Sequence, residues 1–139
     1  MGRQQELYEF MKKIKEPNLY LFFLYGYPGV GKTSFAIKTA TYLIERRVYE
    51  IYFFIDLYDI RDRDMFRNKF NEVTKFGYPN NRNSLNEVRS KQMLIIFDNT
   101  DEFFIQSIKD FQDEIESLRK EFIHTKFIIT CKINNISAL

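Results

Sequence analysis

The stretch LYLFFLYGYPGVGKT, residues 19–33, decides the fold and the kind of site that we expect. Residues 19–25 form an apolar run of strand length, and residues 34–47 have the spacing of a helix. The turn between them fits G-x-x-x-x-G-K-[ST], the phosphate-binding P-loop, which requires a strand before the turn and a helix after it. Both conditions are met, so the sequence predicts nucleotide binding at this turn.

Each residue type in the turn has a physical reason to be there. Gly26, Gly29 and Gly31 let the backbone curl so that N–H groups point inward, and the following helix directs its positive end to the same point. Lys32 adds a charge for the outer phosphates, and the Thr33 hydroxyl is a suitable ligand for Mg²⁺. The predicted nucleotide-binding residues in this segment are Gly26, Tyr27, Pro28, Gly29, Val30, Gly31, Lys32, Thr33 and Ser34.

The rest of the chain alternates strand and helix patterns, which predicts parallel βαβ units and a three-layer α/β fold. In such a fold, ligands bind at the carboxyl ends of the strands. Ser84 is expected to cap a short helix, with Glu87 completing a capping box. Further strands are predicted at 51–57, 93–97 and 127–130, and helices at 4–15, 34–47, 59–75 and 106–123.

Polar residues at two strand ends complete the expected site. Asp98 follows the apolar run 93–97, as the Walker B carboxylate of P-loop NTPases does, and is predicted to hold Mg²⁺ with Thr33. Asn99 cannot act as a base, so Asp101 and Glu102 are the candidates for activating water, although acidic residues also favour a helix N-terminus. At the end of the run 127–130, Thr130 and Lys132 are predicted to reach the nucleotide. Lys32, Asp98, Asp101 and Glu102 form the expected catalytic set.

Length and composition restrict the class of protein. A chain of 139 residues with 45% hydrophobic and 29% charged residues suits one globular domain. The net charge of +2 is too balanced for a nucleic-acid footprint, so no direct nucleic-acid partner is expected. The single cysteine, Cys131, excludes an intrachain disulfide and favours a reducing, cytoplasmic location. No apolar run reaches the ~18 residues of a membrane span.

With these residues in place, the chain resembles the nucleotide-binding domain of STAND-class ATPases, NB-ARC-like with NACHT as the close second. The resemblance lies in a Gly-Arg…Glu-Leu entry at 2–7, the P-loop at 26–33, the Walker B segment at 93–102 and a sensor strand at 127–132. It implies an ADP/ATP switch with Mg²⁺ and slow hydrolysis at most. It also implies flanking helical, winged-helix and repeat domains as partners, and self-association. Lys132 and Asn99 stand where these families mostly carry Arg and Asp, which weakens the expectation of sensing and fast hydrolysis.

The same resemblance implies a sheet ordered 5-1-4-3-2. Since nothing after Lys132 is long enough for a fifth strand, the expected order is 1-4-3-2, and residues 1–139 are interpreted as a C-terminally truncated domain. The absence of an Asn-Lys-x-Asp box favours ATP or ADP over guanine nucleotides, and a kinase for small metabolites is the less favoured alternative. Two other interpretations stay open: an AAA-type, origin-recognition-like ATPase, and a degenerate module that binds nucleotide without cycling.

Overall fold

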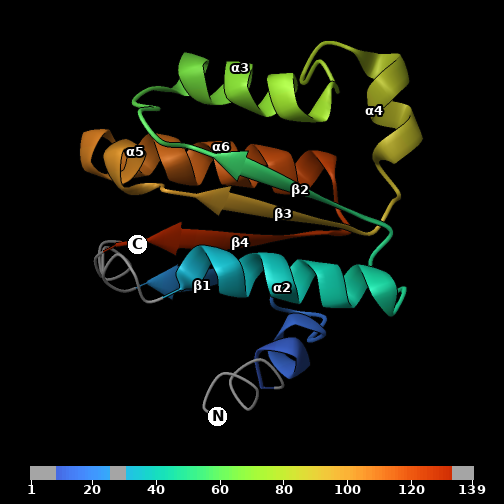
Figure 1. Ribbon diagram of the computed structural model, residues 1–139. Helices are drawn as coiled ribbons and strands as arrows, with labels where there is room; N and C mark the ends of the chain where they lie inside the picture. Colours follow the sequence, from blue (N-terminus) through green and yellow to red (C-terminus); the bar gives the residue numbers. More distant parts are fainter. Residues whose placement is uncertain (1–8, 26–30, 133–139) are drawn as a thin grey trace.

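Four parallel strands form a single sheet in the order β1-β4-β3-β2, with helices on both faces (Figure 1). This computed structural model describes residues 9–25 and 31–132. The predicted α/β fold and the predicted strand order 1-4-3-2 are both confirmed. Within the described residues, β1 pairs with β4 on one side, and no strand pairs with its other side.

The elements lie close to the predicted ranges. Residues 9–14 are helical, which is the described part of the helix predicted over 4–15. In chain order, the remaining elements are β1 (Leu21–Tyr25), α2 (Lys32–Glu45), β2 (Ile51–Asp56), α3 (Arg63–Thr74), α4 (Arg82–Val88), β3 (Met93–Asp98), α5 (Asp101–Gln106), α6 (Ile108–Glu121) and β4 (Thr125–Cys131).

The sheet separates two apolar cores. On one face, Ala36, Ala40 and Leu43 of α2 pack with Met11 and Ile14 of the N-terminal helical segment. The other face is larger and rich in phenylalanine, because α3, α5 and α6 all cover it. Every residue of β3 is buried, since this strand lies between β4 and β2 and has helices on both sides. Burial on both faces explains why the strand reads as a continuous apolar run.

Some helix boundaries differ from the predictions, and α3 begins at Arg63 rather than at residue 59. The helix expected over 106–123 is α6, which begins at Ile108 because Ser107 is extended (φ −164°) and its hydroxyl accepts a hydrogen bond from the Asp110 N–H at 3.1 Å. Ser107 is thus the N-cap of α6, and α5 is a separate short helix before it. The N-cap of α4 is Asn81 and not Ser84; the Asn81 side chain accepts from the Ser84 N–H at 3.4 Å.

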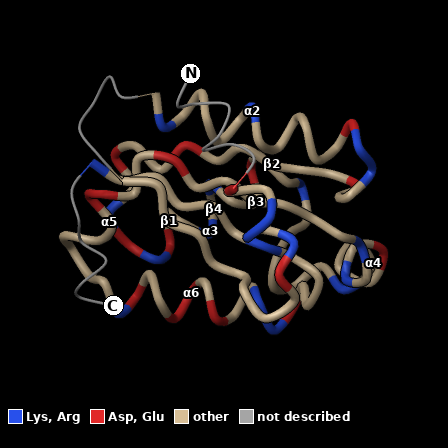
Figure 2. Tube along the Cα trace, turned by 90° about the horizontal axis from the view of Figure 1, so that it is seen from below, with Lys and Arg blue, Asp and Glu red and all other residues tan. Residues whose placement is uncertain are grey.

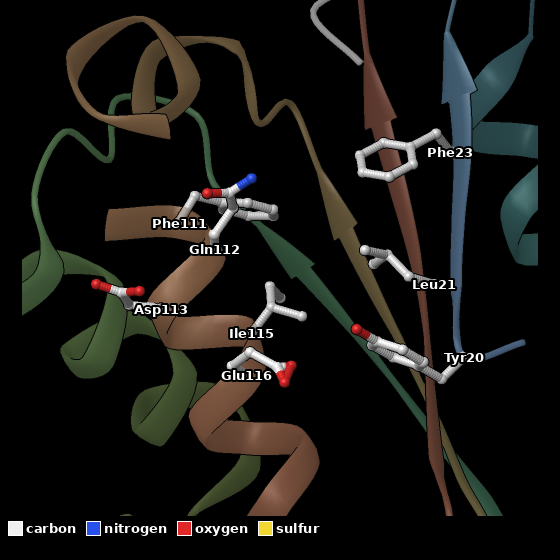
Figure 3. Close-up of a pocket in the computed structure, with 8 residues that line it drawn as sticks. All are labelled: Tyr20, Leu21, Phe23, Phe111, Gln112, Asp113, Ile115 and Glu116. Carbon is white, nitrogen blue, oxygen red and sulfur yellow. The ribbon is translucent and has the colours of Figure 1, made fainter. Parts of the chain in front are cut away.

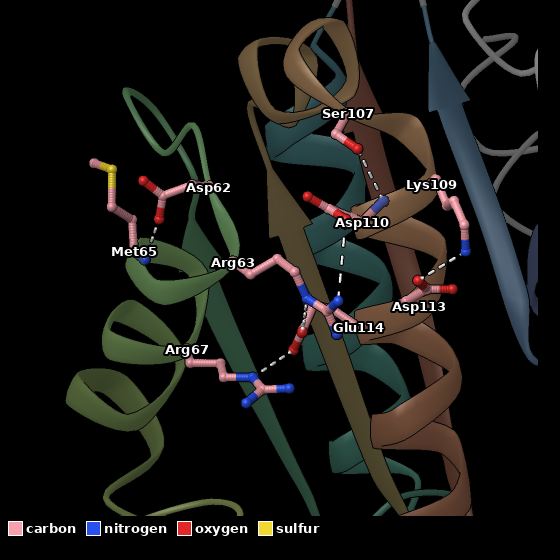
Figure 4. A network of polar contacts seen from close by, with 9 residues as sticks. All are labelled: Asp62, Arg63, Met65, Arg67, Ser107, Lys109, Asp110, Asp113 and Glu114. Carbon is pink, nitrogen blue, oxygen red and sulfur yellow. Dashed lines mark hydrogen bonds and ion pairs between the residues drawn. The ribbon is translucent and has the colours of Figure 1, made fainter.

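A buried carboxylate joins α3 to α6 (Figure 4). Glu114 on α6 has no exposed surface, yet Arg63 and Arg67 reach it from α3. The Arg63 Nε to Glu114 Oε2 distance is 2.7 Å, and the Arg67 Nε to Glu114 Oε1 distance is 3.0 Å. The hydrogen bond to Glu114 raises the pKa of both guanidinium groups. Because each carboxylate oxygen has its own donor, the charge is compensated inside the core.

Candidate functional site

A cavity of about 370 Å³ lies where the carboxyl ends of β3 and β4 meet the start of α2. Parallel strands bring their carboxyl ends to one edge, which is where ligands bind in sheets of this kind. The sheet thus assembles three segments that are far apart in the sequence. The residues that line the cavity are Gly31, Lys32, Thr33, Ser34, Asp98, Asn99, Asp101, Thr130, Cys131 and Lys132.

Gly31 sets the direction of α2 at this cavity. Its φ of 82° lies in the left-handed region, which glycine adopts without the steric cost of a Cβ atom. Its carbonyl accepts the first helical hydrogen bond, from the Phe35 N–H at 2.9 Å. The helix therefore begins at Lys32, so its positive end and the side chains of Lys32 and Thr33 lie at the cavity. This arrangement is suited to an anion.

Asp98 connects β3 to both α2 and β4. Its Oδ1 accepts a hydrogen bond from the Thr33 hydroxyl at 2.9 Å and another from the Thr130 hydroxyl. The residue is 5% exposed, so this carboxylate is almost removed from water. Two hydroxyl donors to one oxygen fix the Asp98 side chain at the cavity wall.

The oxygen atoms of Thr33 and Asp98 fit Mg²⁺, which prefers hard oxygen ligands. Across residues 9–25 and 31–132, no group of three or more His, Cys, Asp or Glu side chains is placed to hold a metal ion. Mg²⁺ typically takes one or two protein ligands and completes its octahedral shell with phosphate oxygens and water. Thr33 and Asp98 would therefore hold the ion together with a bound nucleotide, where it neutralises phosphate charge.

Hydrogen bonds connect the end of β4 to the start of α5. The Thr130 carbonyl accepts from the Thr100 N–H at 3.2 Å and from the Thr100 hydroxyl at 2.9 Å. The Lys132 N–H donates to both carboxylate oxygens of Asp101, at 2.9 and 3.0 Å. Asp101 lines the cavity, whereas Glu102, in the same first turn of α5, is not among the lining residues. The structure thus brings one of the two candidate acids to the cavity.

Asn99 joins the site through a contact that the sequence did not suggest. Its φ is 56°, its N–H donates to the Thr130 hydroxyl at 3.1 Å, and its side-chain Nδ2 donates to Asp56 Oδ1 at 2.9 Å. Asp56 ends β2 as Asp98 ends β3, and the two are register partners. The sequence contained part of this signal, because Asp56 lies near the end of the predicted strand 51–57, but the contact with Asn99 depends on the strand register.

Five of the predicted binding residues lie outside the described residues, namely Gly26, Tyr27, Pro28, Gly29 and Val30. The other predicted residues of the turn, together with Asp98, Asp101, Thr130 and Lys132, come together at one cavity. Their roles in binding and catalysis stay predictions.

Cys131 lines the cavity but is 1% exposed. Burial raises the pKa of its thiol to about 11, the charge of Asp101 adds to the rise, and Lys32 opposes it. A thiol that stays protonated at neutral pH is a weak nucleophile. We therefore regard Cys131 as a packing residue of the cavity wall.

We expect the folded protein to react with a thiol reagent such as DTNB at pH 8 far more slowly than the protein unfolded in urea. Absorbance at 412 nm follows the reaction with DTNB, with glutathione as the reference thiol. Equal rates for folded and unfolded protein would show that the thiol is accessible.

The raised pKa of Cys131 also sets how stability depends on pH. The free energy of unfolding is constant below the unfolded pKa of about 9, and it falls as the pH rises towards 11 because the folded protein keeps the thiol protonated.

A second cavity, of about 380 Å³, lies between β1 and α6 (Figure 3). Leu21 and Phe23 of β1 point towards Phe111 and Ile115 of α6, so its walls are mostly apolar. The charged residues that line it, Asp113 and Glu116, are both acidic and would repel a phosphate group, and no lysine or arginine is among its lining residues. We therefore place the functional site at the strand ends.

In a comparison with protein families, the model of the ATPase family associated with various cellular activities (AAA) matches residues 22–136. A search of curated proteins gave no match. Similar solved structures include the Aeropyrum pernix ORC2 protein in its ADPNP-ADP complexes, with 13% identity and a TM-score of 0.68 over 98% of this chain and 42% of that one.

Two further structures show the same fold. Cdc6p from Pyrobaculum aerophilum has 14% identity and a TM-score of 0.69 over 96% of this chain and 40% of that chain. Domain III of the Thermotoga maritima replication initiation protein DnaA has 17% identity and a TM-score of 0.58 over 95% of this chain and 52% of that chain. The chain spans about half or less of the length of these structures.

These findings confirm the predicted P-loop ATPase fold and favour the AAA-type alternative over the STAND resemblance, which stays a prediction. The expected absence of a nucleic-acid partner also stays a prediction, since several neighbours are replication initiation proteins. Figure 2 shows acidic and basic residues interspersed along α6. Among the described residues, no helix is long and apolar enough to cross a membrane.

Proposed function

The chain belongs to the AAA family of ATPases, and on that premise we propose that it binds ATP or ADP with Mg²⁺ at the cavity beside α2. The proposal rests on one observation: the Thr33 hydroxyl at the start of α2 donates a hydrogen bond to Asp98 Oδ1 at the end of β3, at 2.9 Å. These are the two groups that a P-loop ATPase needs beside a nucleotide-bound Mg²⁺.

The residues around the cavity suit complementary roles. Lys32 supplies positive charge for the outer phosphates, and the backbone N–H groups at the start of α2 supply donors. Thr130 and Lys132, at the end of β4, also line the cavity. The Lys132 ammonium is a point charge, so it can report the presence of a third phosphate without the bidentate geometry of arginine.

We further propose that hydrolysis is slow and that the bound nucleotide acts as a switch. Asn99, directly after Asp98, cannot take a proton from water, so the reaction lacks a base at that position. The two nucleotide states would then favour different arrangements of neighbouring parts of the protein. The family match favours a switch of the AAA type, related to the replication-initiation proteins, over a signalling NTPase of the STAND class.

A fluorescence titration with mant-ATP and mant-ADP, with Mg²⁺ or with EDTA, tests the proposal. We expect saturable binding that is tighter with Mg²⁺, and a turnover well below the roughly 10 per second of a median enzyme. Asp98→Asn keeps the shape and removes the charge, so it should abolish most of the Mg²⁺ dependence. Folded wild-type protein that shows no saturable binding would contradict the proposal, and turnover of tens per second would contradict the slow switch.

A further inference from the structure

We propose that Asp56 is a positioning residue for ATP hydrolysis, because it fixes the Asn99 amide so that its oxygen orients the attacking water. The inference rests on the proposed function and deepens it by assigning the water-orienting group. Asp56 lies on the edge strand β2, outside the cavity lining, and acts through Asn99.

The direction of the amide follows from the chemistry of its partner. A charged carboxylate has only acceptor oxygens, so the group that faces it at 2.9 Å must be the Asn99 Nδ2 donor. The amide oxygen of Asn99 is then directed away from Asp56. Since Asn99 lines the cavity, this oxygen is the available acceptor on that side chain for a water molecule beside a bound nucleotide.

Further hydrogen bonds restrain both Asn99 and Asp56. The Asn99 backbone is in the left-handed region (φ 56°), which asparagine tolerates better than most residues, and its N–H is bound to the Thr130 hydroxyl. Asp56 Oδ1 also accepts from the Tyr58 N–H at 2.9 Å, which restrains this exposed carboxylate. Through Thr130, the network continues to Asp98 and to Thr33 at the start of α2. The geometry therefore links the edge strand to the Mg²⁺ position.

An amide in this position suits the reaction. The water oxygen forms a bond to the γ-phosphorus, the bond from the γ-phosphorus to the β–γ bridging oxygen breaks, and ADP leaves with the bonding electron pair. The proton of the water goes to the phosphate product and then to solvent, so Asn99 takes no proton. An acceptor that only orients the water is a known solution in phosphoryl transfer. The Asp56 charge polarises the amide and makes its oxygen a stronger acceptor.

The other candidate acids are less suited to this task. Both carboxylate oxygens of Asp101 accept from the Lys132 N–H, and Glu102 does not line the cavity. Asn99 is therefore the residue next to Asp98 whose free acceptor and restrained backbone fit a water-orienting role.

A double-mutant cycle tests the inference in the full chain. Asp56→Ala removes the carboxylate, and Asn99→Gly removes the amide while keeping the left-handed backbone accessible. We expect each single variant to lower kcat roughly tenfold, because a misplaced reacting group costs this much or more, and to leave the Kd for ADP unchanged. The double variant should lose no more than either single variant, since Asp56 acts through Asn99. Asp56→Asn, which keeps an acceptor oxygen but not the charge, should retain part of the rate.

Asp59→Asn is the matched control. Asp59 is an exposed acid in the loop just after β2, and its carboxylate makes a 3.8 Å ion pair with Arg61. We expect wild-type kcat from this variant. An unchanged kcat in Asp56→Ala, multiplied losses in the double variant, or absence of turnover by wild-type protein that binds ATP would each overturn the inference. Failure of folded wild-type protein to bind nucleotide would instead refute the proposed function on which the inference rests.

Discussion

Lys32→Ala is expected to weaken ATP binding by about 100-fold, or ~2.8 kcal/mol at 1.4 kcal/mol per tenfold change. Lys32 is the first residue of α2 and lines the cavity with Asp98. Two unit charges 4 Å apart interact by about 4 kcal/mol near a protein surface, so the loss of one phosphate contact is large enough to account for this change. The loss should be smaller for ADP, which lacks the third phosphate.

Lys38→Ala is the control for Lys32→Ala, because Lys38 is exposed on the same helix and does not line the cavity. It should bind ATP as the wild type does, which separates a contact at the cavity from a general loss of positive charge. Isothermal titration with Mg²⁺ present gives both affinities. Equal ATP affinity for Lys32→Ala and the wild type would show that the nucleotide does not bind beside α2.

Replacing both arginines that reach Glu114 is expected to lower the free energy of unfolding by about 3 kcal/mol. Arg63→Ala with Arg67→Ala leaves a fully buried carboxylate without its donors, at 2.7 and 3.0 Å in the wild type. The arginine side chains are 39% and 37% exposed, so solvent screens the attraction, but the cost of keeping Glu114 out of water remains. Urea denaturation measures the change.

A third substitution distinguishes buried charge from lost packing. Adding Glu114→Leu to the double variant removes the uncompensated charge, and we expect it to recover most of the lost stability. Arg61→Ala is the matched surface control, because Arg61 forms an exposed ion pair with Asp59 at 3.8 Å, and pairs of this kind contribute up to about 1 kcal/mol. If the triple variant were no more stable than the double variant, the loss would come from packing.

The parts of the fold that follow from local patterns were predictable from the sequence. Asp98 and Thr130 were placed at one site because each ends a buried apolar strand, and parallel strands share one carboxyl edge. The order of the strands came from the family resemblance and not from periodicity.

The remaining features depend on contacts that the sequence pattern does not contain. The short helix α5 (Asp101–Gln106) was not among the predicted helices, and the extended backbone of Ser107 separates it from α6. Glu114 is a charged residue of a type that is almost never fully buried unless it is paired, and two arginines from another helix permit its burial. The Asp56–Asn99 contact requires both the strand register and a left-handed residue. In each case tertiary geometry overrides the local preference.

The position of β1 in the sheet has a consequence for local stability. Within the described residues, β1 has β4 as its one neighbouring strand, whereas β3 is held from both sides. A strand with fewer backbone partners opens at a lower free energy, and its amide hydrogens exchange sooner. The predicted phosphate-binding residues follow β1 directly in the chain. If β1 must be paired with β4 for nucleotide to bind, part of the binding free energy is used to keep β1 paired. The measured affinity for nucleotide then includes the free energy of holding β1 in the sheet.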